Sequence, residues 1–163
     1  MRALVVFFWC LLCFSSNAEN IKIGFIDTNQ VVTSLSQYKS SLEQIAIQFE
    51  PKKQELLDLF KHIELVRSNI DLIKKSDSSL PFESELLKLS NLEQSFKQET
   101  EFWQKKLNNQ KIDLLNEIEI LINQVINEYA IRESYDLILY DNIAFVNDKI
   151  NITEEIISEI EKM

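Results

Sequence analysis

Residues that form turns are scarce in this chain of 163 residues, which contains one glycine, Gly24, and two prolines, Pro51 and Pro81. Folds with many short elements need more turn residues than this, so the composition favours a few long helices. No glycine-rich loop of the kind that binds phosphate groups occurs in the sequence. The length is that of one domain.

Cysteine is nearly as scarce, and both cysteines, Cys10 and Cys13, fall within the first 18 residues, MRALVVFFWCLLCFSSNA. This segment has one positive charge, an apolar run and then small residues. It predicts a cleavable signal peptide at residues 1–18, too short for a stable membrane span. Two alternatives are a lipoprotein signal that uses Cys13 and a retained membrane anchor. Cleavage would leave a mature chain without cysteine, and therefore without disulfides or thiol chemistry.

Histidine is limited to His62, which falls beside the apolar pattern of its segment and is predicted to be a solvated surface residue. A zinc site needs further histidine or cysteine ligands. A Ser-His-Asp triad would have to form on a narrow helical hairpin that offers no pocket. The sequence therefore predicts a protein that is not an enzyme and that uses no cofactor and no metal.

Basic residues are outnumbered, with 17 Lys and Arg against 26 Asp and Glu, a net charge of −9 at pH 7. Loss of Arg2 with the signal peptide would bring the mature chain to −10. An acidic exported protein is a poor candidate for nucleic-acid binding, so no nucleic acid is expected among its partners.

The clearest positive feature is an apolar stripe with strictly alternating spacings of three and four residues, which predicts a coiled coil. Only Lys52 interrupts it. Its twelve positions are Leu35, Tyr38, Leu42, Ile45, Phe49, Lys52, Leu56, Leu59, Ile63, Val66, Ile70 and Ile73. Pro51 lies inside this segment and is expected to kink or restart the helix, because proline removes one helical hydrogen bond.

The polar segment SDSSLPF breaks the stripe, which then resumes with Glu93 and Thr100 as weak points. The resumed apolar positions are Phe82, Leu86, Leu89, Phe96, Trp103 and Leu107. The simplest arrangement is a helical hairpin over residues 36–134, with its tip near residues 76–82 and with arms over about 36–75 and 83–134.

A second apolar face appears on the returning arm beyond Leu107. It consists of Ile112, Leu115, Ile122 and Ile126. This part of the helix must therefore contact more than its hairpin partner.

The two ends of the mature chain, residues 19–35 and 135–163, are predicted to form a small base for the hairpin. IKIGFID at residues 21–27 alternates as a strand, and Asn29 is expected to cap the helix that follows. Strands are also expected at residues 136–141 and 143–146, on either side of a turn at Asp141-Asn142. These strands should pair with the strand from the other chain end.

A closing helix is predicted at the C-terminus, with Thr153 as its cap and an apolar face. Three short strands and one short helix bury little apolar surface, so several copies are expected to combine their bases around an axis. The fold class is therefore α+β, mostly α: a long coiled-coil hairpin that projects from a small strand-containing oligomerisation body. The residues expected in that body include Ile21, Ile23, Phe25, Leu137, Leu139, Phe145, Ile156 and Ile160.

Both ends of the chain resemble a known family. IKIGFIDTNQVVTSLSQYKSSLEQI resembles the opening strand, short helix and long-helix entry of the Skp/OmpH family of periplasmic chaperones, and ESYDLILYDNIAFVNDKINITEEIISEI resembles its closing segment. The resemblance implies a homotrimer whose hairpins surround a cavity below a central body. It also implies export to the periplasm and ATP-independent binding of unfolded outer-membrane proteins, which prevents their aggregation. The best-known members are basic, so for this acidic chain no lipopolysaccharide or anionic-membrane site is expected.

Candidate client contacts lie on the arms. Four lysines, Lys52, Lys53, Lys105 and Lys106, are expected to face one another in mid-arm near Pro51, either as a contact zone for acidic client segments or neutralised by Glu50, Glu55 and Glu101. Large apolar residues that could touch client are Phe60, Phe82 and Phe102, whereas Phe96 and Trp103 lie on the stripe. The alternative function is a structural spacer or adaptor in the cell envelope.

Overall fold

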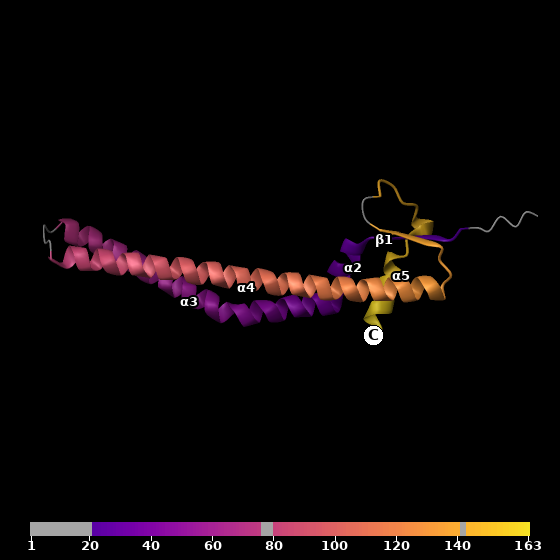
Figure 1. Cartoon of the computed structure of the whole chain (residues 1–163), viewed down its shortest axis with the longest axis horizontal. Coiled ribbons are helices and arrows are strands. Elements are labelled where there is room, and N and C mark those ends of the chain that lie inside the picture. Colours follow the sequence, from indigo (N-terminus) through magenta and orange to yellow (C-terminus); the bar gives the residue numbers. More distant parts are fainter. Residues whose placement is uncertain (1–20, 76–79, 141–142) are drawn as a thin grey trace, which may run out of the picture.

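The computed structural model describes residues 21–75, 80–140 and 143–163; the predicted signal peptide, most of the predicted tip and the turn at Asp141-Asn142 lie outside these residues. The elements are β1 (Ile23–Ile26), α2 (Thr28–Ser34), α3 (Ser36–Lys75), α4 (Leu80–Arg132), β2 (Leu137–Tyr140), the 3-10 helix η2 (Asp148–Ile150) and α5 (Thr153–Glu161). Figure 1 shows two long helices side by side, with the short elements gathered at one end around the last turns of α4. This end is called the base below.

Helices α3 and α4 form the predicted hairpin, and the apolar stripe is its seam. The buried positions of α3 are Phe49, Leu56, Ile63, Val66 and Ile70, all of which belong to the stripe. At 1.5 Å per residue, the 40 residues of α3 make an arm about 60 Å long. Helix α4 begins at Leu80, slightly earlier than predicted, because a proline such as Pro81 is tolerated in the first helical turn, where its missing N–H has no helical partner.

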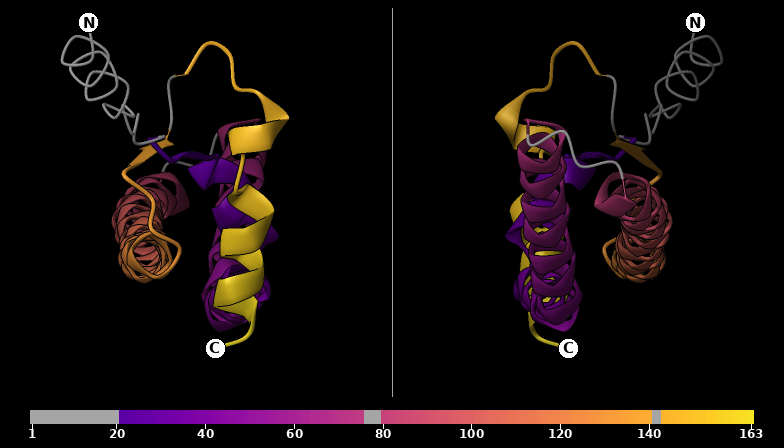
Figure 2. Two further views of the ribbon diagram at one scale, coloured as in Figure 1. Left: turned by 90° about the vertical axis from the view of Figure 1, so that its right-hand side faces the viewer. Right: turned by 90° about the vertical axis from the view of Figure 1, so that its left-hand side faces the viewer.

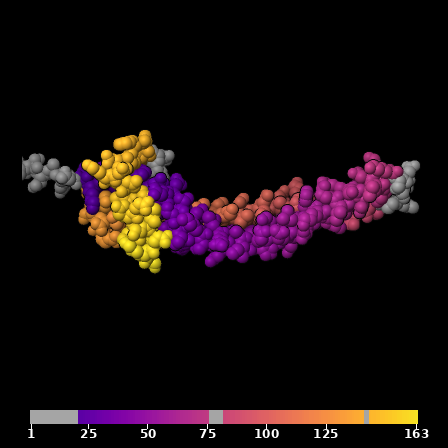
Figure 3. Space-filling model, turned by 180° about the vertical axis from the view of Figure 1, so that it is seen from behind, coloured from indigo at the N-terminus to yellow at the C-terminus, as the bar shows by residue number. Residues whose placement is uncertain are grey.

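Of the two outcomes expected at Pro51, a kink or a restart of the helix, the restart is wrong. Helix α3 is continuous from Ser36 to Lys75, with Pro51 inside it. The proline leaves the carbonyl of Ile47 without its usual helical donor, but Ile47 lies on the solvent side, where its side chain is 67% exposed and water can reach the backbone. Seam packing by Phe49 and Leu56 on either side keeps the helix in place. Figure 3 shows the double arm as a bowed rod without a break.

Strands β1 and β2 pair in parallel, which confirms that the two ends of the chain meet in one sheet. Ile23 lies opposite Leu137, and Phe25 lies opposite Leu139. On the other side of β1, Phe25 forms an isolated parallel bridge with Asn151.

The third predicted strand, at residues 143–146, is wrong. No strand is assigned there, and Phe145 is 82% exposed. A strand needs a ladder partner, and both edges of β1 are already occupied by β2 and Asn151. The segment therefore runs outward as a loop between β2 and η2, which the end-on views in Figure 2 show standing away from the arms.

Both predicted helix caps are also wrong. Asp27, rather than Asn29, caps α2, and its side chain accepts a hydrogen bond from the Gln30 N–H at 2.9 Å. Thr153 is the first residue of α5, and its N–H donates to Asn151 Oδ1 at 3.0 Å. In each case an Asx side chain before the helix takes the role, because it accepts from backbone N–H groups two or three residues later.

The base has a small hydrophobic core of its own. Its buried members are Ile26, Val31, Leu35, Leu114, Ile118, Ile122, Val125, Ile126, Ile152, Ile156 and Ile160. The second apolar face of α4 is therefore confirmed at Ile122 and Ile126, although Ile112 remains 54% exposed. Gly24 permits close packing here, because a Cβ at this position would lie 2.8 Å from Ile152 Cδ1.

Candidate functional site: the outer sheet face and the mid-arm groove

One face of the sheet is apolar and is only partly covered by the residues that the structure describes. Side chains alternate along a strand, so the register places Ile23, Phe25, Leu137 and Leu139 on the same face, called the outer sheet face below. Leu137 is 46% exposed, and the other three are half-buried. On the opposite face, Ile26 is completely buried against the core.

The structure separates the residues predicted for the oligomerisation body into four groups. The outer sheet face accounts for four of them, and Ile21, which precedes β1, is 69% exposed. Phe145 lies on the outward loop. Ile156 and Ile160 face inward from α5 and belong to the core of the base, so they stabilise the base rather than offer a surface.

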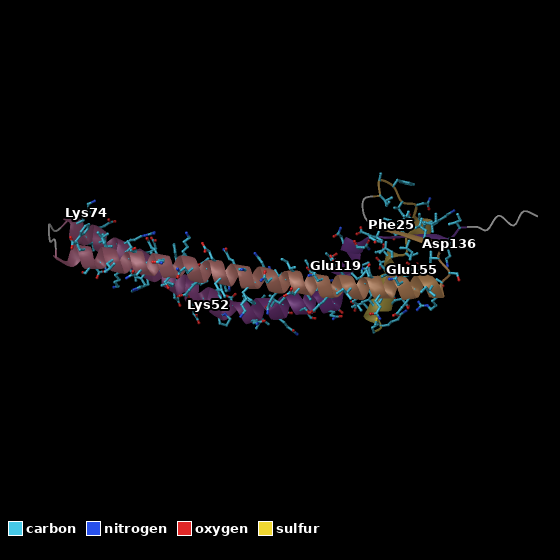
Figure 4. All side chains as sticks on the ribbon, in the orientation of Figure 1. Phe25, Lys52, Lys74, Glu119, Asp136 and Glu155 are labelled. Carbon is cyan, nitrogen blue, oxygen red and sulfur yellow. The ribbon has the colours of Figure 1, made fainter. Side chains whose placement is uncertain are left out.

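Polar contacts hold the two chain ends together beside the sheet. The Asp27 N–H donates to Thr153 Oγ1 at 3.0 Å, and the Lys22 N–H donates to Asp136 Oδ2 at 2.7 Å. Figure 4 shows Phe25 and Asp136 close together at the base although they come from opposite ends of the chain. These contacts fix the parallel register that forms the outer sheet face.

The last helix also anchors the start of the first arm. Glu161 accepts hydrogen bonds from the Ser36 N–H at 2.6 Å and from the Ser36 hydroxyl at 2.7 Å. A carboxylate at a helix N-terminus satisfies free N–H groups and faces the positive end of the helix dipole. Both hydrogen bonds lower the pKa of Glu161, and the one from the Ser36 backbone N–H has the larger effect.

Two polar positions that weaken the apolar stripe form ion pairs across the arms. Lys52 Nζ lies 2.7 Å from Glu99 Oε2 and 2.9 Å from Glu55 Oε2. The hydrogen bond from Lys52 lowers the pKa of Glu99, and the hydrogen bond to Glu99 raises the pKa of Lys52. Nearer the tip, the Arg67 guanidinium lies 2.6 Å from Glu93 Oε1. These pairs connect the arms where apolar packing is interrupted.

A shallow groove opens between the arms next to Lys52. It has a volume of ≈ 280 Å³ and is called the mid-arm groove below. Its lining residues are Gln48, Phe49, Lys52, Phe102, Trp103 and Lys106. Trp103 Nε1 donates to the carbonyl oxygen of Phe49 at 3.4 Å, which joins the two helices at the floor of the groove.

A second groove of ≈ 330 Å³ shares Phe49 and Trp103 with the first. It lies on the other side of the seam, where its charged lining residues are Glu50, Lys53 and Lys111. Phe49 and Trp103 therefore form the wall between two grooves.

The four predicted lysines do not form one cluster. Lys52 and Lys106 line the mid-arm groove, whereas Lys53 lines the second groove and Lys105 lines neither. Lys52 is paired with Glu55 and Glu99, and Lys53 is paired with Glu50 at 3.0 Å. The neutralising role foreseen for Glu101 falls instead to Glu99, which lies two residues earlier on the same helix.

The candidate aromatic contacts differ in exposure. Phe60 is 46% exposed, and its ring lies 5.9 Å from that of Phe96 on the other arm. Phe102 is 69% exposed beside the mid-arm groove, and Phe82 is half-buried in the first turn of α4. Sequence reasoning assigned Trp103 to the seam. Its indole nitrogen was the signal for a hydrogen bond between the arms, because a buried indole N–H needs an acceptor.

Catalytic features are not prominent in the part of the chain that the structure describes. It contains no group of three or more His, Cys, Asp or Glu side chains placed to hold a metal ion. His62 is exposed. Among the same residues, no helix is long and apolar enough to cross a membrane.

A further cavity of ≈ 500 Å³ lies between α2, α4 and the end of β2, with Glu119 as its one charged lining residue.

Comparison with known proteins connects this architecture to one family. The family model for outer membrane protein (OmpH-like) matches residues 22–160, which include every described helix and strand except the last residue of α5. The chain belongs to the OmpH-like family. No curated protein matches it.

A solved structure has the same fold. It is the crystal structure of an OmpH-like protein from Caulobacter crescentus CB15, described as a candidate outer membrane chaperone. The match has a TM-score of 0.73 and covers 87% of this chain and 85% of the other, with 12% sequence identity. At this identity the likeness establishes the shared fold of hairpin and base.

Proposed function

We propose that this OmpH-like protein is an ATP-independent holdase chaperone of the periplasm. It binds unfolded outer-membrane proteins between its helical arms and prevents their aggregation without chemical catalysis. Family membership supports a chaperone role, and so does the name given to the solved structure with the same fold. Residues 1–18 act as a cleaved signal peptide in this proposal.

The observation that carries the proposal is the outer sheet face at the foot of a projecting hairpin. A sheet of two short strands with one apolar face only partly covered is marginal alone and would be stabilised by further copies. Three copies joined through this face would place three arms, each about 60 Å long, around a common space. That geometry suits a flexible client that makes many weak contacts.

Residues on the arms supply the adaptable contacts. Half-exposed aromatic side chains such as Phe60 and Phe102 offer apolar area, and lysines offer charge. No single contact is expected to be essential, because binding spread over many weak contacts tolerates the loss of one.

An aggregation assay tests the function. Several unrelated β-barrel membrane proteins are diluted from denaturant with and without the chaperone, and light scattering is recorded. A holdase suppresses the scattering of all of them without ATP. An envelope spacer or adaptor suppresses none, and that result would reject the proposal.

The assembly and processing are tested separately. Analytical ultracentrifugation of the exported protein is expected to give the mass of a trimer. Mass spectrometry is expected to give a mature chain that begins at Glu19, whereas a lipid-modified chain beginning at Cys13 would indicate membrane tethering.

A further inference from the structure

The mid-arm groove combines an aromatic floor with two lysines, which is an unusual pairing in a chain of net charge −9. We propose that this groove binds an aromatic side chain that stands beside a carboxylate in an unfolded polypeptide. This inference rests on the proposed function and names the kind of client segment that the arm holds.

The apolar part of the groove suits one aromatic ring. Phe49 forms the floor and is 6% exposed, Trp103 is half-buried, and Phe102 is 69% exposed at the side. Ring systems attract one another edge-to-face or offset, beyond the gain from burial alone. The volume of ≈ 280 Å³ is just below the range of about 300–1,000 Å³ typical of small-molecule pockets, so the groove holds a side chain rather than a larger ligand.

The charged part of the groove selects a carboxylate. No Asp or Glu is among its lining residues, and its two charged residues are Lys52 and Lys106. Lys52 is already occupied by Glu55 and Glu99. Lys106 forms no ion pair with any residue that the structure describes, so its ammonium group is free to pair with an incoming acidic side chain.

The second groove has a carboxylate in its lining although it shares the same aromatic wall. Its lining includes Glu50, which lies 3.0 Å from Lys53. That carboxylate repels an incoming acid and neutralises one of the two lysines on this side. Each groove keeps one lysine without an ion pair among the described residues, Lys106 or Lys111, but only the second groove has a carboxylate in its lining.

The groove is also held open before any ligand arrives. The Trp103 indole is tied to the Phe49 carbonyl, and Lys52 is tied to Glu99 on the opposite helix. A site that is already formed loses less conformational entropy on binding than one that must be ordered.

Fluorescence anisotropy with short labelled peptides tests the inference on the full protein. Three unstructured peptides differ at one pair of residues, which is Phe-Asp, Leu-Asp or Phe-Asn. The Phe-Asp peptide is expected to bind most tightly, and the other two about three- to tenfold more weakly, since each lacks one of the two contacts.

Matched variants distinguish binding in the groove from general effects of charge and apolar surface elsewhere on the protein. Lys106→Glu is expected to weaken binding of the Phe-Asp peptide about tenfold and leave the Phe-Asn peptide nearly unchanged. The control is Lys105→Glu, which makes the same charge change at the adjacent exposed position outside the groove and should shift binding at most about twofold. Phe102→Ala is compared with Ile120→Ala, which truncates a side chain of nearly equal exposure, 69% against 68%, elsewhere on α4.

Equal losses for Lys105→Glu and Lys106→Glu would overturn the inference, because the effect would then be general charge. Vesicles of anionic phospholipid that bind the unaltered protein but not Lys106→Glu, with no difference among the peptides, would also overturn it and would assign the groove to a membrane surface. The aggregation assay is run alongside with the same variants. If the unaltered protein suppresses aggregation but both lysine variants lose peptide binding equally, the holdase function stands and the groove proposal is rejected. If the protein binds the Phe-Asp peptide selectively but does not suppress aggregation, the holdase function is rejected and the groove proposal stands.

Discussion

Glu161, the last residue of α5, accepts two hydrogen bonds from Ser36, the first residue of α3, with distances of 2.6 and 2.7 Å. The C-terminal helix thus supplies the cap for the arm that begins near the N-terminus. The cap fixes the direction in which the arm leaves the base, since a helix end without a partner for its N–H groups frays.

Replacing this carboxylate should make the base less stable to heat and less sensitive to acid. The pKa of Glu161 is lowered in the folded chain, so the carboxylate stabilises the folded state above the ordinary glutamate pKa of about 4.3 and loses this effect as pH falls through the lower folded value. Glu161→Gln should therefore lower the melting temperature at pH 7 and flatten its decline in acid. Circular dichroism melts from pH 3 to pH 7 measure both.

The control for this experiment is Glu155→Gln, which removes the same charge from an exposed position of the same helix. A fall in melting temperature equal to that of Glu161→Gln would show that the effect comes from charge in general and would contradict the capping role.

Gly24 should be the least replaceable residue of the sheet. An alanine Cβ would lie 2.8 Å from Ile152 Cδ1 and 3.1 Å from Tyr135 Cε1, so Gly24→Ala should destabilise the base by roughly 1–3 kcal/mol, as overpacking does. Urea denaturation measures the change. Because Ile152→Val removes the atom in closest conflict, the double variant should recover part of the loss, and full additivity of the two changes would reject this explanation.

The ion pair between Lys52 and Glu99 should respond to charge reversal as a pair. Lys52→Glu and Glu99→Lys each place like charges at a contact of 2.7 Å, whereas the double variant restores opposite charges. Both side chains are 41% exposed, so a small favourable coupling free energy is expected from a double-mutant cycle. The coupling should shrink as salt is raised, and a coupling near zero at low salt would contradict a stabilising cross-arm bridge.

The outer sheet face should control assembly. Leu137→Asp places a charge on that face and is expected to shift the protein from the proposed trimer to a monomer in analytical ultracentrifugation, because burial of an unpaired carboxylate between copies is unfavourable. Ile131→Asp serves as the control, since Ile131 is 83% exposed six residues earlier in the chain. Equal dissociation by both variants, or by neither, would place the interface elsewhere.

The hairpin and the meeting of the chain ends were predictable because their signals are periodic and long. A stripe with alternating spacings of three and four over about 40 residues predicts a coiled coil. Its polar interruption, Lys52, and the weak point of the resumed stripe, Glu93, are both paired across the seam. Sequence reasoning could find these interruptions but could not choose Glu99 over Glu101 as the partner of Lys52, because a difference of two residues, about half a helical turn, decides which side chain faces the other arm.

The short elements were less predictable because their conformation depends on neighbours distant in sequence. Residues 143–146 have strand propensity, but the edge they would need is taken by Asn151. The caps were misplaced because Asp27 and Asn151 precede their helices by one or two residues, and several neighbouring residues are chemically suited to the same role. The mid-arm groove could not be read from the sequence, since Lys105 and Lys106 differ only in which side of the helix they occupy.

The parallel pairing of β1 with β2 has a consequence for how the chain is made. The hydrogen bond between Lys22 and Asp136 closes a loop of 114 residues, and no residue of β1 can find its neighbour until nearly the whole polypeptide has been synthesised. The hairpin can form once both arms have been synthesised, whereas the sheet also needs β2, which follows the second arm in the chain. A chain that ends before Leu137 would keep both arms but would lack β2, and so it would lack the sheet that joins the two ends of the chain.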